Sequence, residues 1–149
     1  MRKNFWKTIP LNDLSQEEWE LLCDGCGKCC LNKFQKTKKS VPFYTSVACK
    51  FLDIKKCICT VYNERKNKRK DCLVLSQNNI NKIVNWLPTS CSYRLIYEKK
   101  DLPSWHHLNK NKNKNVHNTK NSVKDFAISE EYVDSSDISN FIIEKFDKN

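Results

Sequence analysis

Cysteines provide the strongest chemical signal in this sequence. The chain holds nine cysteines among 149 residues, and four of them form a C-x2-C-x2-C-C run: Cys23, Cys26, Cys29 and Cys30. Thiolates three residues apart can bind one ion, because a tight turn between them points both sulfurs inward. Such a turn favours glycine, which adopts a positive φ without strain. The only two glycines, Gly25 and Gly27, lie inside this run, so the run predicts a metal-binding knuckle.

The other cysteines are candidate metal ligands as well: Cys49, Cys57, Cys59, Cys72 and Cys91. One tetrahedral zinc ion takes four ligands, and so does one iron–sulfur cluster. Nine cysteines can therefore supply up to two such sites. Because Cys29 and Cys30 are adjacent, we expect their side chains to diverge and not to bind one mononuclear ion together. One of the two then serves a second site or only packs.

The spacing leaves the metal open between zinc and iron. Three cysteines at C-x2-C-x2-C match the start of a bacterial ferredoxin run, but the fourth follows at once. A remote ligand, for example Cys49 or Cys57, is then needed. Zinc sites more often use two separated C-x2-C knuckles, and here the other close pair is Cys57-x-Cys59. Reduced core cysteines and a redox dithiol are the alternatives to a metal site.

Histidines are secondary candidates for the same chemistry. An imidazole from His106 or His117 could complete a site. The alternative is a hydrogen-bonded histidine beside Trp105, or an exposed histidine in a loop. Asp24 and Asp71 could orient ligands or be solvated carboxylates. The sequence has no glycine-rich phosphate loop, no G-x-S-x-G and no H-E-x-x-H, so whether the chain is an enzyme stays open.

Two helices are well signalled around these residues. Ser15 and Glu18 form a capping-box pattern, with Leu14 and Trp19 at the staple positions. This pattern predicts a helix over residues 16–22 that leads into the cysteine run. A second helix is expected from near Ser76, with a helical apolar repeat that ends before Pro88; its apolar residues are Ile80, Ile83, Val84 and Leu87.

The rest of the chain predicts few regular elements. Residues 31–75 look irregular, with short extended pieces such as 41–47, and residues 93–97 form a short helix or strand. Phe126 and Ile128 are expected on one face of a strand, and residues 109–121 read as a flexible Lys/Asn-rich loop. A final helix is expected from Asp137, with four inward residues: Ile138, Phe141, Ile142 and Phe146. We predict one small cysteine-rich, metal-stapled α+β domain over residues 1–149.

The basic charge is attributed to composition rather than to a nucleic-acid partner. The net charge is +10, but 23 of the 27 basic residues are Lys, and Lys and Asn share AT-rich codons. The densest run, Arg65–Lys70, is interpreted as a solvated loop. No apolar run is long enough to span a bilayer, and the N-terminus lacks the apolar segment of a signal peptide. We expect a cytoplasmic protein with reduced thiols, with nucleic acid unlikely as a partner and no membrane.

Several segments together resemble a bacterial family, the CxxCxxCC proteins of the YcgN type. They are WELLCDGCGKCC (19–30), VACKFLDIKKCICTVY (47–62), DCLVL (71–75), NWLPTSCSYRLIYEKKDLPSWHHL (85–108) and residues 116–128. All nine cysteines, with His106 and His117, match positions of that family. The resemblance implies a cytoplasmic zinc- or iron-chelating domain with no established activity.

Three functions follow from this reading. The first is a protein that binds zinc or iron, or an iron–sulfur cluster, through cysteine thiolates. The second is a structural-zinc module that binds a protein partner. The third is an iron–sulfur redox or protein-modifying enzyme with a redox partner, because wider relatives of the family are linked to flagellin lysine methylation.

Overall fold

The computed structural model of the protein describes residues 1–37, 40–109 and 113–143. The α-helices are all short: α1 (Phe5–Thr8), α2 (Gln16–Glu20), α3 (Arg65–Lys68), α4 (Ile80–Ile83) and α5 (Ser92–Tyr97). The strands are β1 (Leu31–Phe34), β2 (Phe43–Ala48), β3 (Leu52–Asp53), β4 (Ile58–Cys59) and β5 (Ile128–Ser129). Single turns of 3-10 helix occupy Leu11–Asp13, Lys28–Cys30, Tyr62–Glu64, Val84–Trp86, His107–Asn109, Val123–Asp125, Glu130–Tyr132 and Ile138–Phe141.

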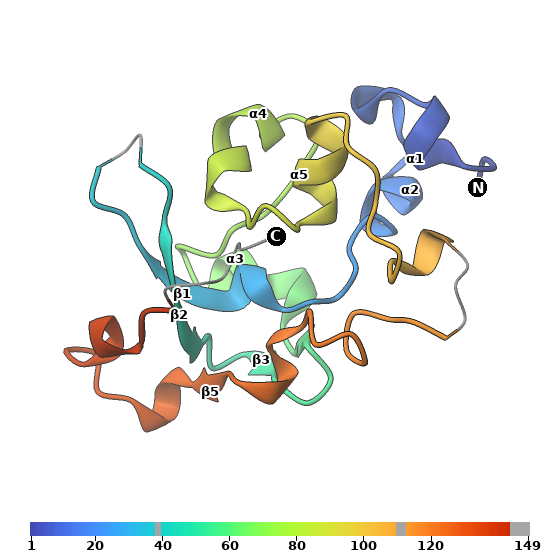
Figure 1. Cartoon of the computed structure of the whole chain (residues 1–149). Helices are drawn as coiled ribbons and strands as arrows, with labels where there is room; N and C mark the ends of the chain where they lie inside the picture. The colour runs from blue at the N-terminus through green and yellow to red at the C-terminus, as the bar shows by residue number, and fades with distance from the viewer. Residues whose placement is uncertain (38–39, 110–112, 144–149) are drawn as a thin grey trace.

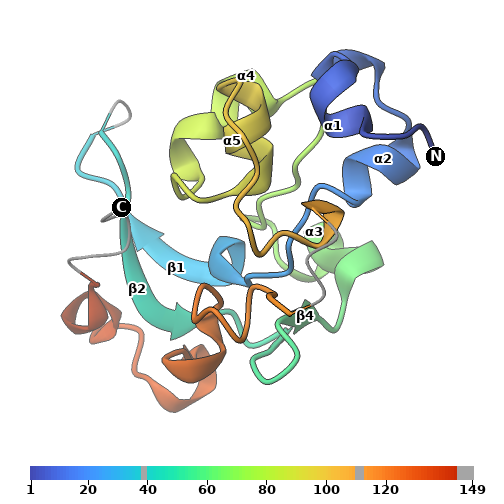
Figure 2. The same ribbon diagram turned by 45° about the vertical axis from the view of Figure 1, so that its right-hand side comes forward.

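This is the α+β architecture with few regular elements that the sequence predicts. Helices α1, α2, α4 and α5 gather on one side of the molecule, and strands β1 and β2 lie on the other (Figure 1; Figure 2). The segment from α2 to β1, which carries the cysteine run, passes between the two groups. In the part of the chain that the structure describes, no helix combines the length and the apolar character needed to cross a membrane.

The helical side begins with the predicted capping box. The backbone N–H of Glu18 donates to Ser15 Oγ (3.2 Å), and the N–H of Ser15 donates to Glu18 Oε2 (3.0 Å). Helix α2 ends at Glu20, two residues earlier than expected. Its apolar face packs into the larger core cluster of the molecule: Phe5, Leu14, Trp19, Leu22, Ile80, Leu87, Tyr93, Leu102 and Leu108.

The second predicted helix begins later than expected, at Ile80 rather than near Ser76. Asn79 explains the difference, because its side chain accepts from the N–H of Ser76 (2.9 Å) and donates to the carbonyl of Val74 (2.8 Å). These bonds hold residues 74–79 in a turn. The helix then narrows to a 3-10 turn over Val84–Trp86 before Pro88.

The sheet side is more regular than the irregular segment that we expected for residues 31–75. Strand β1 pairs antiparallel with β2, from Leu31↔Ala48 to Phe34↔Phe43. Strand β5 pairs parallel with the other edge of β2, and β3 and β4 form a separate small hairpin. A second core cluster lies here: Leu31, Tyr44, Ala48, Leu52, Cys57 and Val123.

Predictions for the C-terminal third fail in part. Val123, which starts a 3-10 turn, is fully buried, whereas Phe126 and Ile128 are 39% and 37% exposed. The expected strand face over Phe126 and Ile128 is therefore wrong, because only Ile128–Ser129 is strand. The final helix is a single 3-10 turn over Ile138–Phe141, and Phe146 lies outside the described residues.

Two segments are predicted as loops. The first contains turns in its described part, and the second is partly helical. Residues 113–121 form turns held by Asn side chains, such as Asn115 Oδ1 accepting from the N–H of Asn118 (2.9 Å), and residues 110–112 lie outside the described part. The solvated loop expected over Arg65–Lys70 is wrong. Residues Arg65–Lys68 form α3, and Arg69 pairs with Glu130 (2.7 Å).

Both glycines adopt the positive φ that the sequence predicts, 73° at Gly25 and 76° at Gly27. A Cβ on Gly25 would meet open space, whereas a Cβ on Gly27 would lie 2.7 Å from Val123 Cγ2. The N–H of Val123 also donates to the carbonyl of Cys26 (2.9 Å). The cysteine run is therefore pinned to the second core cluster at Gly27.

These contacts predict that substitution by alanine lowers the stability of the protein by different amounts at the two glycines. Gly25→Ala should lower the free energy of unfolding by about 1–2 kcal/mol, because alanine disfavours the left-handed backbone. Gly27→Ala should carry that cost and about 1–3 kcal/mol more, because the methyl group overpacks against Val123. Denaturant unfolding of both variants measures the difference. Equal losses would contradict the close packing at Gly27.

A second prediction concerns acid stability. The buried Glu18 carboxylate accepts from the side chain of Arg2 (3.0 Å), and this contact is the main cause that lowers the pKa of Glu18 from 4.5 to about 2. A lowered folded-state pKa stabilises the fold above the unfolded value and loses that contribution as the pH falls. Stability should therefore decline between pH 4.5 and pH 2.

Glu18→Gln should flatten this part of the pH profile, measured by thermal unfolding. Glu17→Gln is the matched control, because Glu17 is an exposed neighbour in the same helix. If both variants keep the slope of the unsubstituted protein, the Arg2–Glu18 pair is not its source.

Candidate metal centre

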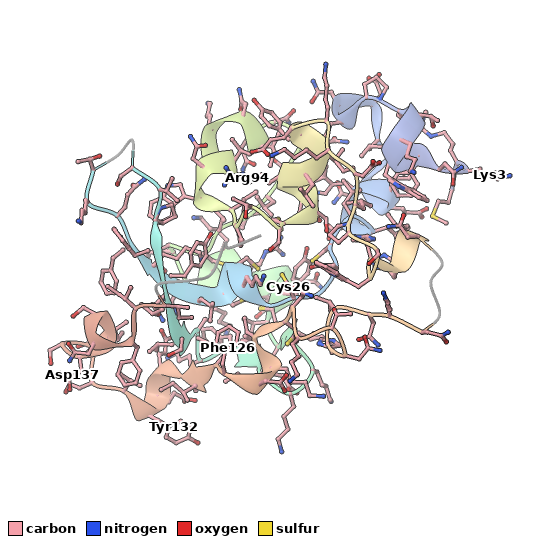
Figure 3. The ribbon with its side chains drawn as sticks, in the orientation of Figure 1. Lys3, Cys26, Arg94, Phe126, Tyr132 and Asp137 are labelled. Carbon is pink, nitrogen blue, oxygen red and sulfur yellow. The ribbon has the colours of Figure 1, made fainter. Side chains whose placement is uncertain are left out.

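The cysteine run crosses the middle of the molecule, between the helices and the sheets. The labelled Cys26 lies there, between Arg94 on the helical side and Phe126 (Figure 3). The turn is fixed by the N–H of Cys26, which donates to Asp24 Oδ1 (3.1 Å), and by the N–H of Cys30, which donates to the carbonyl of Gly27 (3.0 Å). All nine cysteines are free thiols, so every one is available as a ligand.

One group of thiols joins the run to helix α5. We call it the first thiol set: Cys23, Cys26, Cys29 and Cys91. Cys91 is the N-cap residue of α5 and packs against the first core cluster. The side chain of Lys28 donates to Ser90 Oγ (2.9 Å), and this bond ties the run to the segment that carries Cys91.

The members of this set act on one another electrostatically. Cys23 is an exposed residue, yet desolvation raises the pKa of its thiol to about 12, with Cys29 and Cys91 adding to the shift. Burial raises the pKa of Cys26 as well, and Cys29 and Cys91 are again among the contributing charges. The pKa of Cys91 rises to about 12 for the same reasons. The four thiols therefore share one neighbourhood.

A second group gathers on the sheet side. We call it the second thiol set: Cys30, Cys49, Cys59 and Cys72. The neighbouring Cys29 thiol and burial raise the pKa of Cys30, and Cys49 and Cys59 raise it further. Burial raises the pKa of Cys72, with contributions from Cys29, Cys59 and Cys49. These four cysteines come from four separate segments of the chain, which the fold brings together.

Cys29 and Cys30 connect the two sets. The expected divergence of the adjacent side chains stays a prediction, although their thiols shift each other's pKa. The pKa of Cys29 is lowered, first by the Cys30 thiol, and the pKa of Cys30 is raised by the same contact. Cys29 acts on the pKa of Cys23, Cys26 and Cys91 and also on that of Cys72, whereas Cys49 and Cys59 act on the pKa of Cys30.

Two cations lie against the thiols. Lys33 Nζ donates to the carbonyls of Cys29 (2.8 Å) and Leu31 (2.7 Å), and burial lowers its pKa while Cys29 and Cys30 act to raise it. Burial acts to lower the pKa of Arg69, but its contacts with Glu130 and the Cys49 thiol raise it. Positive charge at these positions favours thiolates over thiols.

Cys57 belongs to neither thiol set, but it packs against the run at Gly27. It is 6% exposed, and its thiol donates to the carbonyl of Ile54 (3.4 Å). Its sulfur would lie 3.6 Å from a Cβ built on Gly27. Burial raises its pKa, and its strongest neighbours are Ser122, Val123 and Lys124 rather than the thiols of the two sets. Cys57 thus packs in the second core cluster.

The histidines occupy structural positions. His106 is 1% exposed, its Nε2 lies 3.0 Å from the carbonyl of Leu22, and its Nδ1 accepts from the N–H of Leu108 (3.2 Å). Both ring nitrogens are engaged, which requires a neutral ring protonated at Nε2, and burial lowers the pKa of His106. His117 is half-buried, and its Nδ1 has no hydrogen-bond partner among the described residues.

The sequence did not reveal how the cysteines divide. Cys91 acts on the pKa of Cys23 and Cys26, and nothing in its local sequence marks it as their neighbour. Whether Cys49, Cys57 or Cys91 is the remote ligand stays a prediction. Within residues 1–37, 40–109 and 113–143, no three His, Cys, Asp or Glu side chains meet closely enough to hold one ion. Metal binding, its ligands and the identity of the metal stay predictions.

Comparison with known proteins gives related chains from several bacteria. A UPF0260 protein of Gluconobacter oxydans is 48% identical over 126 residues, which cover 85% of this chain and 77% of the relative. A UPF0260 protein of Pseudomonas putida is 41% identical over 93% of this chain and 92% of its own length. A third, from Rhodobacter capsulatus, is 41% identical over 97% of this chain and 96% of its own length.

No family model and no solved structure matches the chain. The names of these relatives state no activity, and the YcgN type with its CxxCxxCC motif stays a prediction. Identity above 40% over nearly the whole length of both proteins nevertheless settles the relationship. The chain belongs to the UPF0260 family of bacterial proteins.

Proposed function

We propose that this chain is an iron–sulfur protein whose centre is held by the first thiol set. The proposal rests on the position of Cys91 near the run. The Lys28–Ser90 bond and the burial of α5 hold Cys91 at this position. Three cysteines at C-x2-C-x2-C and one remote cysteine make the four ligands that one cluster takes.

An all-thiolate set fits zinc as well as iron. A tetrahedral zinc site takes four ligands around one ion, whereas the cysteines of a cluster bind different iron atoms. The C-x2-C-x2-C spacing of Cys23, Cys26 and Cys29 matches the start of a bacterial ferredoxin run, and this match favours the cluster.

The protein supplies position and charge to such a centre. Gly25 and Gly27 turn the chain within the run, and Asp24 Oδ1 accepts from the N–H of Cys26. A cluster with four thiolates is anionic, and Lys33 places a positive charge beside Cys29 and Cys26. The bound group would supply one-electron chemistry. Because Cys23 and Cys29 are exposed residues, a redox partner can approach it from solvent.

The first test is the metal content of protein purified without oxygen. We expect iron and acid-labile sulfide, with a brown colour and broad visible absorption. One or two zinc ions per chain without colour would overturn the proposal, and would instead support a structural-zinc module that binds a protein partner.

The second test assigns the ligands. Cys26→Ser and Cys91→Ser should each lose the iron and sulfide of this centre and the matching part of the visible spectrum. Cys57→Ser is the matched control, because its thiol packs in the second core cluster and donates to the carbonyl of Ile54, and it should keep both. Circular dichroism checks that each variant stays folded. Full retention of iron in Cys91→Ser would exclude Cys91 as a ligand.

A further inference from the structure

The second thiol set is built on the backbone of the two small sheets. The N–H of Cys49 donates to the carbonyl of Cys30 (2.9 Å), directly beyond the pair Leu31↔Ala48 of β1 and β2. Cys30 is the last residue of a 3-10 turn and Cys49 is the residue after β2. The backbone bond between them makes Cys30 and Cys49 neighbours where the paired strands end.

A tight turn brings Cys59 to the same place. The N–H of Leu52 donates to the carbonyl of Cys49 (2.9 Å), which reverses the chain after β2. Leu52 then pairs with Cys59 across the hairpin of β3 and β4, and the N–H of Thr60 donates to the carbonyl of Phe51 (2.8 Å). The position of Cys59 relative to Cys49 thus follows from backbone hydrogen bonds.

The partly buried ion pair between Arg69 and Glu130 positions the segment that carries Cys72. The N–H of Cys72 donates to the carbonyl of Arg69 (3.1 Å). The Arg69 side chain donates to both oxygens of Glu130 (2.7 and 2.9 Å). Glu130 also accepts from the N–H of Lys50 (2.9 Å) and from the side chain of Asn32 (3.2 Å). Asn32 and Lys50 flank Cys30 and Cys49, so this network holds the segment of Cys72 against them.

Interactions between the side chains agree with the positions that the backbone hydrogen bonds give to these cysteines. Cys29, Cys49 and Cys59 all act on the pKa of Cys30, and the same three act on the pKa of Cys72. The guanidinium of Arg69 interacts with the Cys49 thiol. All four residues are half-buried, which limits access of water but leaves room at the surface. Four thiols with a cation beside them are a complete ligand set for one cluster.

We propose that Cys30, Cys49, Cys59 and Cys72 hold a second iron–sulfur centre, beside the one proposed for the first thiol set. This inference rests on the proposed function, because it assumes that the chain assembles clusters. The adjacent residues Cys29 and Cys30 would then each bind a different centre. The two centres would be joined by a single peptide unit.

The unsubstituted protein gives the first test. After reconstitution with iron and sulfide under nitrogen, we expect two clusters per chain by iron and sulfide analysis. In the fully reduced protein, electron paramagnetic resonance should show spin coupling between two neighbouring centres. One cluster per chain would overturn the second centre and leave the proposed function intact.

Substitutions on the second thiol set give the second test. Cys59→Ser and Cys72→Ser should each retain about half of the iron and sulfide, and the spin coupling should disappear. Cys57→Ser is again the matched control, two residues from Cys59, and should retain both clusters and the coupling. Cys91→Ser should show the complementary loss, with the spectrum of the second centre remaining.

The outcomes separate the two proposals. If Cys59→Ser and Cys72→Ser keep all the iron while Cys91→Ser loses it, the second centre is wrong and the first stands. If a folded Cys72→Ser loses all iron, the two sets share one centre, and the assignment of two centres is wrong. If the unsubstituted protein takes up no iron and sulfide, the proposed function itself fails.

Discussion

The packing of Gly27 against the second core cluster is the constraint on which the cysteine run depends. The chain must reverse there with φ at 76°, and a side chain would clash, because its Cβ would lie 2.7 Å from Val123 Cγ2. The N–H of Val123 closes the contact by donating to the carbonyl of Cys26. One residue without a side chain thus lets a C-terminal segment lie directly on the run. The thiols on either side of Gly27 are consequently held at fixed places relative to both cores.

The thiols lie where the protein has the least apolar material to stabilise itself. Each core cluster is small, and the run passes between them, with Cys91 packed on one and Cys30 on the other. Buried thiols can become thiolates there only with compensation, since burial raises the pKa of Cys23, Cys26 and Cys91. Lys33 and Arg69 provide part of this compensation. A bound metal centre would provide the rest, and its binding free energy would then contribute to the stability of the fold.

Local chemistry could be predicted from the sequence, and long-range pairing could not. The capping box of α2 and the positive φ of both glycines depend on a few adjacent residues, and both are confirmed. The helical form of Arg65–Lys68 was missed because the run carries only charge, and the anchor of Arg69 is Glu130, far along the chain. Val123 was overlooked as a core residue since Phe126 and Ile128 carry more apolar surface. The candidate ligands were all named, but their division into two sets depends on tertiary contacts such as the Lys28–Ser90 bond.

The turn on which Cys29 and Cys30 lie explains how two adjacent cysteines can have different neighbours. Residues Lys28–Cys30 form one turn of 3-10 helix, in which successive side chains project about 120° apart. Two adjacent thiols on such a turn can touch each other and still face different neighbours, as Cys29 and Cys30 do. A longer spacer would separate the two thiol sets, and a single cysteine would leave one of them with three thiols. The doublet is therefore the shortest covalent link by which two four-thiol sets can share one small fold, and Cys57 is the ninth cysteine, which packs in the second core cluster.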